Sequence, residues 1–197
     1  PVLLSIARPS IFSCDMGRQE IRIAGFGGQG IILSGSIVGK AASVFDKGFA
    51  ALTQSYGPES RGGSCRAEVV ISDVPIDYPY VASPQVQIIL SQEAYAEYGL
   101  NAPPGTLVIV DSDLVNVGSS HNPKPLSIPA SRMAKEIGRP VVANIIMLGF
   151  LAATSDMVPG EALKKAVLDS IPAGTESINI KAFESGYNYG IEHDREI

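Results

Sequence analysis

The chain has 197 residues, of which 45% are hydrophobic and 18% are charged, and its net charge is −5. This length suits one domain with a substantial core, and the composition excludes global disorder. Negative charge without any block of lysine or arginine makes nucleic acid an unsuitable partner. Two distant cysteines, Cys14 and Cys65, and two histidines, His121 and His193, exclude a disulfide framework, a four-thiolate iron–sulfur cluster and a His-rich metal site. We therefore expect a cytoplasmic protein.

Residues 1–15 read PVLLSIARPSIFSCD and precede Met16. Their apolar stretch is too short to span a bilayer, has no positive n-region and carries a proline in its middle. We interpret residues 1–15 as an N-terminal extension and residues 16–197 as the folded domain, with a signal peptide as the weaker alternative. No membrane association is expected.

Strand and helix patterns alternate along the rest of the chain. Short apolar runs predict strands at 21–26, 48–55, 65–72, 86–91 and 106–113, and a brief strand within 126–131. Helical spacing predicts helices at 30–45, 92–100, 132–138, 159–171 and from 181 onward, and a strand tip that leads into an apolar helix at 140–157. Apolar strands separated by helices predict a single doubly wound α/β domain, Rossmann-like, with a mostly parallel sheet and helices on both faces.

A glycine-rich turn, GFGGQG, follows the first strand and precedes a helix. Gly25, Gly27 and Gly30 fit the G-x-G-x-x-G pattern, in which a turn of backbone cradles the phosphates of a dinucleotide. In that pattern Gly25 makes the tight turn, Gly27 lets the backbone approach the pyrophosphate, and Gly30 permits close helix packing. The helix N-terminus then faces the anion. The candidate cofactor-binding residues of this turn are Gly25, Gly27, Gly28, Gln29 and Gly30.

The second half of the dinucleotide pattern is missing. That pattern needs a carboxylate about twenty residues further on, at the tip of the second strand, to bind the ribose hydroxyls. Here the strand offers Gln54 and Ser55, while Asp46 precedes it and Arg61 lies deep in the following loop. We therefore favour glycines that serve a tight strand–turn–helix junction, and keep a stand-alone NAD- or FAD-binding oxidoreductase as the alternative.

The segment TQSYGPESRGGSCRAEV at 53–69 is dense in glycine, tyrosine and arginine. It follows the second strand at its carboxyl end, the edge where open parallel sheets bind ligands. Its glycines permit a positive φ and close approach of another chain or a phosphate, and its arginines suit carboxylate or phosphate. The candidate residues are Tyr56, Gly57, Glu59, Arg61, Gly62, Gly63 and Arg66. The plainer alternative is a surface loop in which Glu59 pairs with one of the arginines.

Three other polar features have structural interpretations. Asp111 and Asp113 share one side of a strand end, and without a further ligand nearby we expect turn formation rather than a metal or acid–base site. Asn144 begins an apolar helix and is expected to cap it. Cys65 is expected to be a small buried residue at a strand start rather than a redox-active thiol.

The motif GFGGQGIILSG followed by QSYGPESRGGSCRAEVVIS resembles the gamma subunit of 2-oxoacid:ferredoxin oxidoreductases. Further matches are DYP at 77–79, VVANIIMLGFLAA at 141–153 and KAFESGYNYG at 181–190, so the resemblance spans about residues 20–190. YGPESRGG together with IDYP is more similar to the 2-oxoglutarate branch than to the pyruvate branch.

The resemblance implies a multi-subunit enzyme that converts a 2-oxoacid and CoA to acyl-CoA, CO₂ and reduced ferredoxin. It places thiamine diphosphate and Mg²⁺ on alpha and beta subunits and iron–sulfur clusters on other chains, including a delta or ferredoxin-like subunit, with no cofactor or metal on this one. This chain would be inactive alone and would pack beside the catalytic pair, where Arg61 and Arg66 would meet CoA phosphates or a partner carboxylate and Tyr56 would stack or hydrogen-bond. A purely structural assembly subunit and a homodimer of the isolated chain stay open.

Overall fold

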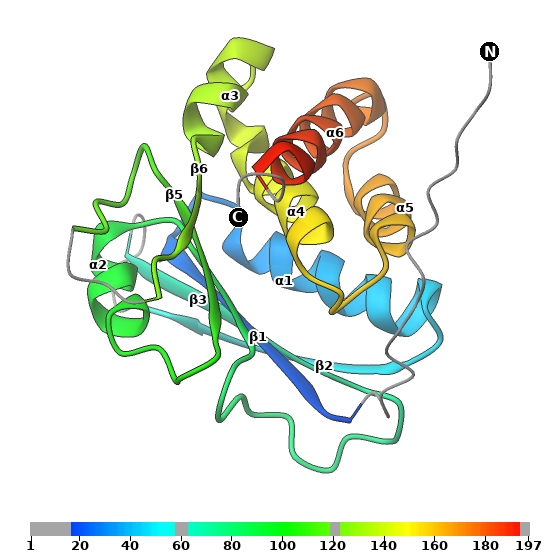
Figure 1. The fold of residues 1–197 in the computed structure, drawn as a ribbon. Coiled ribbons are helices and arrows are strands. Elements are labelled where there is room, and N and C mark those ends of the chain that lie inside the picture. Colours follow the sequence, from blue (N-terminus) through cyan, green and yellow to red (C-terminus); the bar gives the residue numbers. More distant parts are fainter. Residues whose placement is uncertain (1–16, 58–62, 119–122, 194–197) are drawn as a thin grey trace.

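The computed structural model describes residues 17–57, 63–118 and 123–193. A six-stranded sheet with the order β2-β3-β1-β4-β5-β6 lies at its centre (Figure 1). The strands are β1 (Gln19–Phe26), β2 (Phe49–Tyr56), β3 (Ser64–Ser72), β4 (Val86–Ile89), β5 (Leu107–Asp111) and β6 (Leu126–Ile128). The α-helices are α1 (Ile31–Lys40), α2 (Gln92–Ala94), α3 (Ala130–Ile137), α4 (Ala143–Thr154), α5 (Gly160–Ser170) and α6 (Glu176–His193). Shorter helical turns are η1 (Ala41–Phe45), η2 (Tyr95–Gly99) and η3 (Pro140–Val142).

The predicted fold class is confirmed, with one local difference in strand direction. Strands β1, β4, β5 and β6 pair in parallel, but β3 lies antiparallel between β1 and β2. The connection from β2 to β3 spans only residues 57–63, which is too short for the crossover that a parallel pair needs. The tip of β2 therefore lies one strand further from β1 than a dinucleotide fold would place it.

Four helices, α1, α4, α5 and α6, lie on one side of the sheet and enclose the main core, with α1 against β1, β2 and β3 and α6 packed against α4 (Figure 1). Alternation along β1 directs Ile21 and Ile23 into this core, where both are buried. Helices α4 and α6 approach closely because each contributes a glycine to their contact. A Cβ at Gly149 would collide with the Phe183 carbonyl oxygen, and one at Gly186 with that of Ile146.

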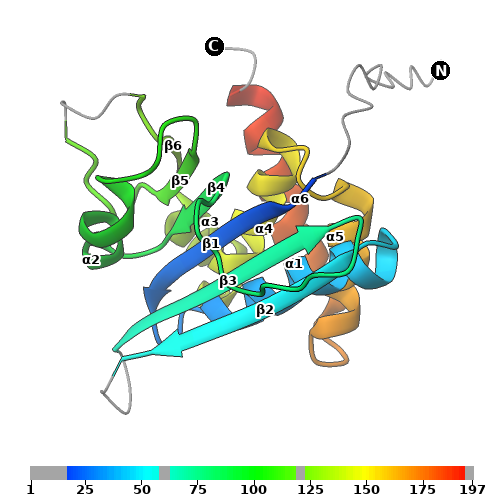
Figure 2. The ribbon, with the colours of Figure 1, turned by 90° about the horizontal axis from the view of Figure 1, so that it is seen from below.

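The opposite face is covered in part by α2 with η2 and in part by the connection from β3 to β4, residues 73–85 (Figure 2). A smaller cluster beneath α2 and η2 buries Tyr95 against Ile89 and Val110. Helices therefore lie on both faces, as expected, but unevenly. No helix in the described parts of the chain has both the length and the apolar content to cross a bilayer.

Several element boundaries differ from the sequence prediction, among them the ends of β4 and β5, which stop at Ile89 and Asp111 rather than at 91 and 113. Residues 140–142 form the 3₁₀ turn η3 rather than a strand tip, because Gly138 ends α3 with a φ of 93° and Pro140 opens the next helical turn. Helix α6 begins at Glu176, before the predicted start at 181. Its first turn is held by Asn179, whose N–H and side-chain amide both donate to the Thr175 carbonyl oxygen.

Candidate functional site

The glycine turn lies at the carboxyl edge of β1, where the backbone must reverse before α1. Gly28 and Gly30 adopt φ values of 98° and 75°, a region that disfavours side chains with a Cβ. Gly30 is also the N-cap residue of α1, and its carbonyl oxygen accepts from the Ser34 N–H at 2.9 Å. The sequence GGQG thus satisfies the backbone requirements of a tight strand–turn–helix junction.

The side chain of Gln29 bonds both strands at this edge, where it also lines a pocket of about 260 Å³. Its Oε1 accepts from the Phe26 N–H at 2.6 Å, and its Nε2 donates to the Leu90 carbonyl oxygen at 2.8 Å. Gly25 leaves room for that amide, since a Cβ there would collide with Gln29 Oε1. The amide therefore bridges the carboxyl ends of β1 and β4, where a dinucleotide fold would seat its ligand.

The turn is also bonded to the connection between β2 and β3. The Gly27 N–H donates to the Gly63 carbonyl oxygen at 2.9 Å. Within the connection itself, the Gly57 N–H donates to the Ser64 carbonyl oxygen at 2.7 Å. The Gln29 N–H donates back to the Phe26 carbonyl oxygen at 3.2 Å. The backbone donors of Gly27 and Gln29 are thus used within the chain, which supports the junction interpretation over a pyrophosphate cradle.

The predicted cap at Asn144 is wrong. Val142 is the N-cap residue of α4, and Asn144 lies inside the helix with only 4% of its surface exposed. Its Nδ2 lies 3.4 Å from the Gly30 carbonyl oxygen and 3.3 Å from Ser34 Oγ, so it donates to the start of α1. Asn144 is buried between α4 and α1, so its amide bonds the start of α1 instead of the first turn of its own helix.

The candidate residues of the 53–69 segment fall into two groups. Tyr56 ends β2 with 62% of its surface exposed, and Gly57 and Gly63 flank the connection that is bonded to the glycine turn. Glu59, Arg61 and Gly62 lie outside the described residues, so the predicted pairing of Glu59 and the role of Arg61 stay predictions.

Arg66 belongs to a polar cluster on the sheet face opposite α1. Arg22 binds Glu68 at 2.7 Å from the adjacent strand, and Arg66 Nε lies 3.6 Å from the other oxygen of that carboxylate. Arg66 Nη1 donates to the Tyr98 hydroxyl at 2.8 Å, and both guanidinium groups lie over the Tyr98 ring. Burial raises the pKa of Tyr98, so its hydroxyl stays protonated.

The sequence reasoning missed three members of this cluster: Arg22, Glu68 and Tyr98. A signal was present for two of them, because Arg22 and Glu68 are charged residues inside otherwise apolar strands. Their register, Arg22 opposite Glu68, depends on the antiparallel pairing of β1 with β3. Tyr98 comes from η2, and only the tertiary structure places it over the two arginines.

A pocket of about 180 Å³ lies beside Arg66, between the end of β1, the start of β3 and the α2–η2 segment. Its polar lining includes Ser91, Glu97 and the Tyr98 hydroxyl. Cys65 also lines it and is largely buried, and burial raises the pKa of its thiol. The prediction that Cys65 is a small buried residue at a strand start is thus confirmed. The pocket can hold a small polar group beside a guanidinium.

Asp111 and Asp113 connect β5 to α3. Asp111 is fully buried and accepts from the Ser131 N–H at 3.0 Å, the Ser131 hydroxyl at 2.6 Å and the Asp113 N–H at 3.0 Å. Burial raises the pKa of Asp111, whereas the Arg132 guanidinium at 2.7 Å lowers that of Asp113. Within the described ranges no three His, Cys, Asp or Glu residues cluster as metal ligands. Both carboxylates thus have the structural role expected of them.

Comparison with known proteins identifies the family. The family model "Pyruvate ferredoxin/flavodoxin oxidoreductase" matches residues 20–189. The 2-oxoglutarate synthase subunit KorC of Methanocaldococcus jannaschii is 49% identical over 178 residues, which cover 89% of this chain and 95% of that protein.

Two solved structures share the fold. The gamma subunit of a keto/oxoacid ferredoxin oxidoreductase from Geobacter sulfurreducens has a TM-score of 0.78 at 39% identity, covering 89% of this chain and 98% of that one. A 2-oxoglutarate:ferredoxin oxidoreductase from Magnetococcus marinus has a TM-score of 0.79 at 23% identity, covering 88% of this chain and 31% of that one. The chain therefore belongs to the pyruvate ferredoxin/flavodoxin oxidoreductase family.

Proposed function

We propose that the chain is the gamma-type subunit of a 2-oxoglutarate:ferredoxin oxidoreductase. The complex converts 2-oxoglutarate and CoA to succinyl-CoA and CO₂ and passes two electrons to ferredoxin. The supporting relative at 49% identity is named as a subunit of 2-oxoglutarate synthase, and the Geobacter relative is named as a gamma subunit. Thiamine diphosphate, Mg²⁺ and iron–sulfur clusters belong to partner subunits, and thiamine diphosphate supplies the carbanion chemistry there. This chain is inactive alone.

The observation that carries the site proposal is the geometry of two guanidinium groups at the single carboxylate Glu68, beside a pocket that Glu93 and Glu97 also line. One carboxylate faces two guanidinium groups, and Arg22 already binds it at 2.7 Å. Arg66 keeps part of its side chain exposed and lines the pocket beside η2. A guanidinium with spare donors suits a phosphate or carboxylate from outside the chain.

We assign Arg66 to the anionic part of CoA at the interface with the catalytic subunits. The Magnetococcus relative was solved with 2-oxoglutarate, coenzyme A and succinyl-CoA bound, which supports CoA as the ligand class. Tyr56, Gly57 and Gly63 lie at the same edge of the sheet as the glycine turn, where the partner would approach. At this edge the chain completes the CoA site together with the catalytic subunits and does not form that site alone.

The test is Arg66→Ala in the complex co-expressed with its thiamine-binding subunits. Glu68 keeps Arg22 as its partner, so the substitution leaves no unpaired buried carboxylate. We expect the KM for CoA to rise about tenfold, the loss of one charge-assisted hydrogen bond, while the KM for 2-oxoglutarate is unchanged. Arg132→Ala, which removes a guanidinium paired with Asp113 at the start of α3, is the matched control.

Three outcomes separate the alternatives. An unchanged KM for CoA with normal assembly would indicate a purely structural subunit at this surface. Absorbance of a bound flavin, or saturable binding of NAD by the purified chain, would indicate a stand-alone nucleotide-dependent enzyme. A monomer–dimer equilibrium of the isolated chain in sedimentation would show that copies pair with themselves when partners are absent.

A further inference from the structure

The amino-terminal edge of the sheet carries a second surface that the proposed site does not use. Residues 73–85 connect β3 to β4 there, and they lie on the face opposite α1, α4, α5 and α6 (Figures 1 and 2). This connection is separated from the glycine turn by the length of β3, roughly 30 Å for nine residues at about 3.4 Å each. Three apolar or aromatic residues in it are more than half exposed: Val74, Tyr78 and Tyr80.

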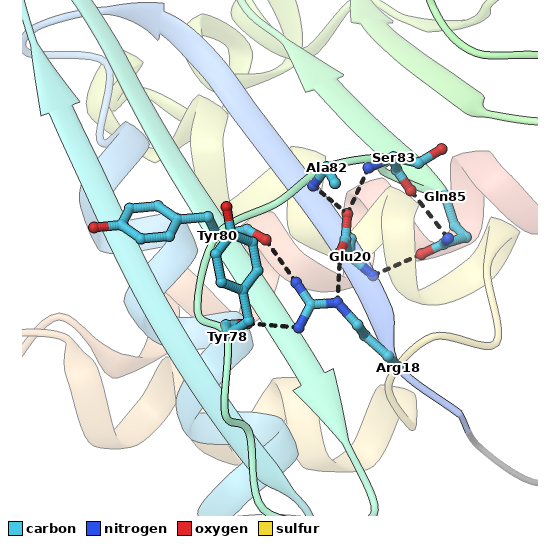
Figure 3. A network of polar contacts seen from close by, with 7 residues as sticks. All are labelled: Arg18, Glu20, Tyr78, Tyr80, Ala82, Ser83 and Gln85. Atoms are coloured by element: carbon cyan, nitrogen blue, oxygen red, sulfur yellow. Dashed lines mark hydrogen bonds and ion pairs between the residues drawn. The ribbon is translucent and has the colours of Figure 1, made fainter.

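A dense polar network holds this connection against β1 (Figure 3). The Arg18 guanidinium donates to the Tyr78 carbonyl oxygen at 2.5 Å, to that of Tyr80 at 2.6 Å and to Glu20 Oε1 at 2.6 Å. All three of its nitrogen atoms are therefore bonded, and two of them bond the backbone of the tyrosines. We call the pair Arg18 and Glu20 the clamp.

Glu20 completes the clamp from the other side. Its Oε2 accepts from the N–H groups of Ala82 and Ser83, each at 2.7 Å, and its own N–H donates to Gln85 Oε1 at 2.6 Å. Burial alone would raise the pKa of Glu20, but the N–H of Ser83, the Arg18 guanidinium and the N–H of Ala82 lower it below its ordinary value. The clamp therefore contains an ionised carboxylate with every oxygen bonded.

The clamp fixes the backbone of the tyrosines, and the Arg18 guanidinium also lies over the Tyr78 ring, 5.8 Å from its centroid. Tyr78 and Tyr80 are 59% and 56% exposed, with ring centroids 5.3 Å apart at 59°. The ring of Tyr80 points away from the clamp (Figure 3). A backbone segment held in place before binding loses little conformational entropy when a partner covers it, and tyrosine is enriched among the residues that dominate binding energy.

The charge of the connection specifies the chemistry of a partner. Residues 73–85 contain Asp73 and Asp77 but no lysine or arginine, and the only cation bound to the connection in the described structure, Arg18, is fully engaged. Asp73 and Asp77 are exposed. A complementary surface would carry arginine or lysine, which pair with carboxylates and stack on tyrosine rings.

We propose that Tyr78 and Tyr80, with the nearby Asp73 and Asp77, form a docking surface for another subunit of the same oxidoreductase. The facing surface of that subunit carries arginine or lysine among apolar residues. This inference rests on the proposed function, because it needs a partner subunit. It adds a contact at the edge of the sheet remote from the CoA interface. The chain is thus held by its partners at two separated points.

The test is a Tyr78→Ala, Tyr80→Ala double variant in the co-expressed complex, with tag-based recovery of the partner subunits as the readout. The clamp bonds to the backbone of both positions, so the fold should persist, and the thermal midpoint of the isolated chain checks this. We expect the affinity of assembly to fall at least about tenfold, the loss of two interfacial aromatic side chains. Tyr187→Ala, at an exposed tyrosine of α6, is the control and should assemble normally.

Hydrogen exchange of the wild-type chain supplies an independent measurement. Amides of residues 73–81 should exchange more slowly in the complex than in the isolated chain, and Asp73→Asn with Asp77→Asn should reduce the salt dependence of assembly. If the double variant assembles as well as the wild type, and residues 73–81 gain no protection from exchange in the complex, this inference is overturned and the proposed function stands. If the isolated chain self-associates and the double variant abolishes this, the surface binds a second copy of the chain and the inference is overturned. If the wild type fails to assemble with the partner subunits, the proposed function itself is refuted.

Discussion

The two edges of the sheet are built with different polar side chains for the same purpose. At the carboxyl edge, the neutral amides of Gln29 and Asn144 hold the glycine turn to β4 and α4. At the amino edge, the ionised clamp of Arg18 and Glu20 holds the connection between β3 and β4. Polar residues thus immobilise the backbone at both edges, and only the ionised clamp of the two arrangements depends on pH.

The largest effect is expected at the carboxyl edge, for Gly30→Ala. A Cβ at Gly30 would lie 2.5 Å from Asn144 Nδ2, on a residue that also has a positive φ. Crowding and backbone strain together should lower the free energy of unfolding by about 2–4 kcal/mol, measured by denaturant titration. Gly28→Ala is the matched control, because Gly28 shares the positive φ but has open space around it. Equal losses in the two variants would show that Asn144 does not pack against the turn as described.

The second effect concerns the clamp, through Glu20→Gln. An amide keeps one acceptor oxygen, so its NH₂ group must face either the Arg18 guanidinium or the N–H groups of Ala82 and Ser83. We expect the free energy of unfolding to fall by about 2 kcal/mol at neutral pH. Glu184→Gln, which breaks the exposed pair with Lys164, should cost well under about 1 kcal/mol. If Glu20→Gln lowers the free energy of unfolding no more than Glu184→Gln does, apolar contacts rather than the clamp hold residues 73–85.

The pH dependence sharpens the difference between the edges. The pKa of Glu20 is lowered in the folded state from its ordinary 4.5, so its stabilising contribution is fully present above that value and is lost as pH falls through the lower pKa of the folded state. The stability gap between wild type and Glu20→Gln should therefore be constant near neutrality and shrink below about pH 4.5. Denaturant titrations from pH 7 to pH 3 measure it. A gap that stays constant throughout would contradict an ionised clamp.

The smallest effect is expected for Gln29→Ala at the carboxyl edge. Loss of its two hydrogen bonds should cost about 1–2 kcal/mol, with no dependence on pH between 4 and 8 since the amide does not titrate. Gln54→Ala, at an exposed amide in β2, should be nearly neutral. Calorimetry with NAD and with FAD tests whether Gln29→Ala gains binding of a nucleotide at this edge.

Helices and strands with strong apolar patterns were predictable from the sequence. Short turns and helix starts were less predictable. The strands at β1, β4 and β5 and the helices at α4 and α5 follow from runs of apolar residues at the spacing of a strand or helix. The 3₁₀ turn at Pro140–Val142 was predicted as a strand tip, because two β-branched residues after a proline suit either structure locally. The start of α6 was missed because Ile178 and Ile180 alternate with polar residues, a spacing typical of a strand.

For the site, the sequence identified the loops but not their internal contacts. Arg66 and the glycine turn stand out by residue type, whereas the cluster of Arg22, Glu68 and Tyr98 needs three elements to meet. The clamp is similar, because Arg18 meets the carbonyl oxygens of Tyr78 and Tyr80 across 60 and 62 positions of sequence. Backbone carbonyl acceptors have no signature in an amino-acid sequence, so such contacts are invisible before folding.

The sequence by itself determined the α/β class, the single domain and the tight glycine junction, since periodicity and local motifs express short-range physics. The family followed from the resemblance of its motifs to known sequences. Only the tertiary structure decided that β3 inserts antiparallel beside β1, that Gln29 bridges the ends of β1 and β4, and that Asn144 bonds the start of α1 rather than capping its own helix. The physical reason is that a buried polar group forms its hydrogen bond with whichever donor or acceptor the packing places next to it. That partner depends on how distant segments pack, which no local pattern encodes.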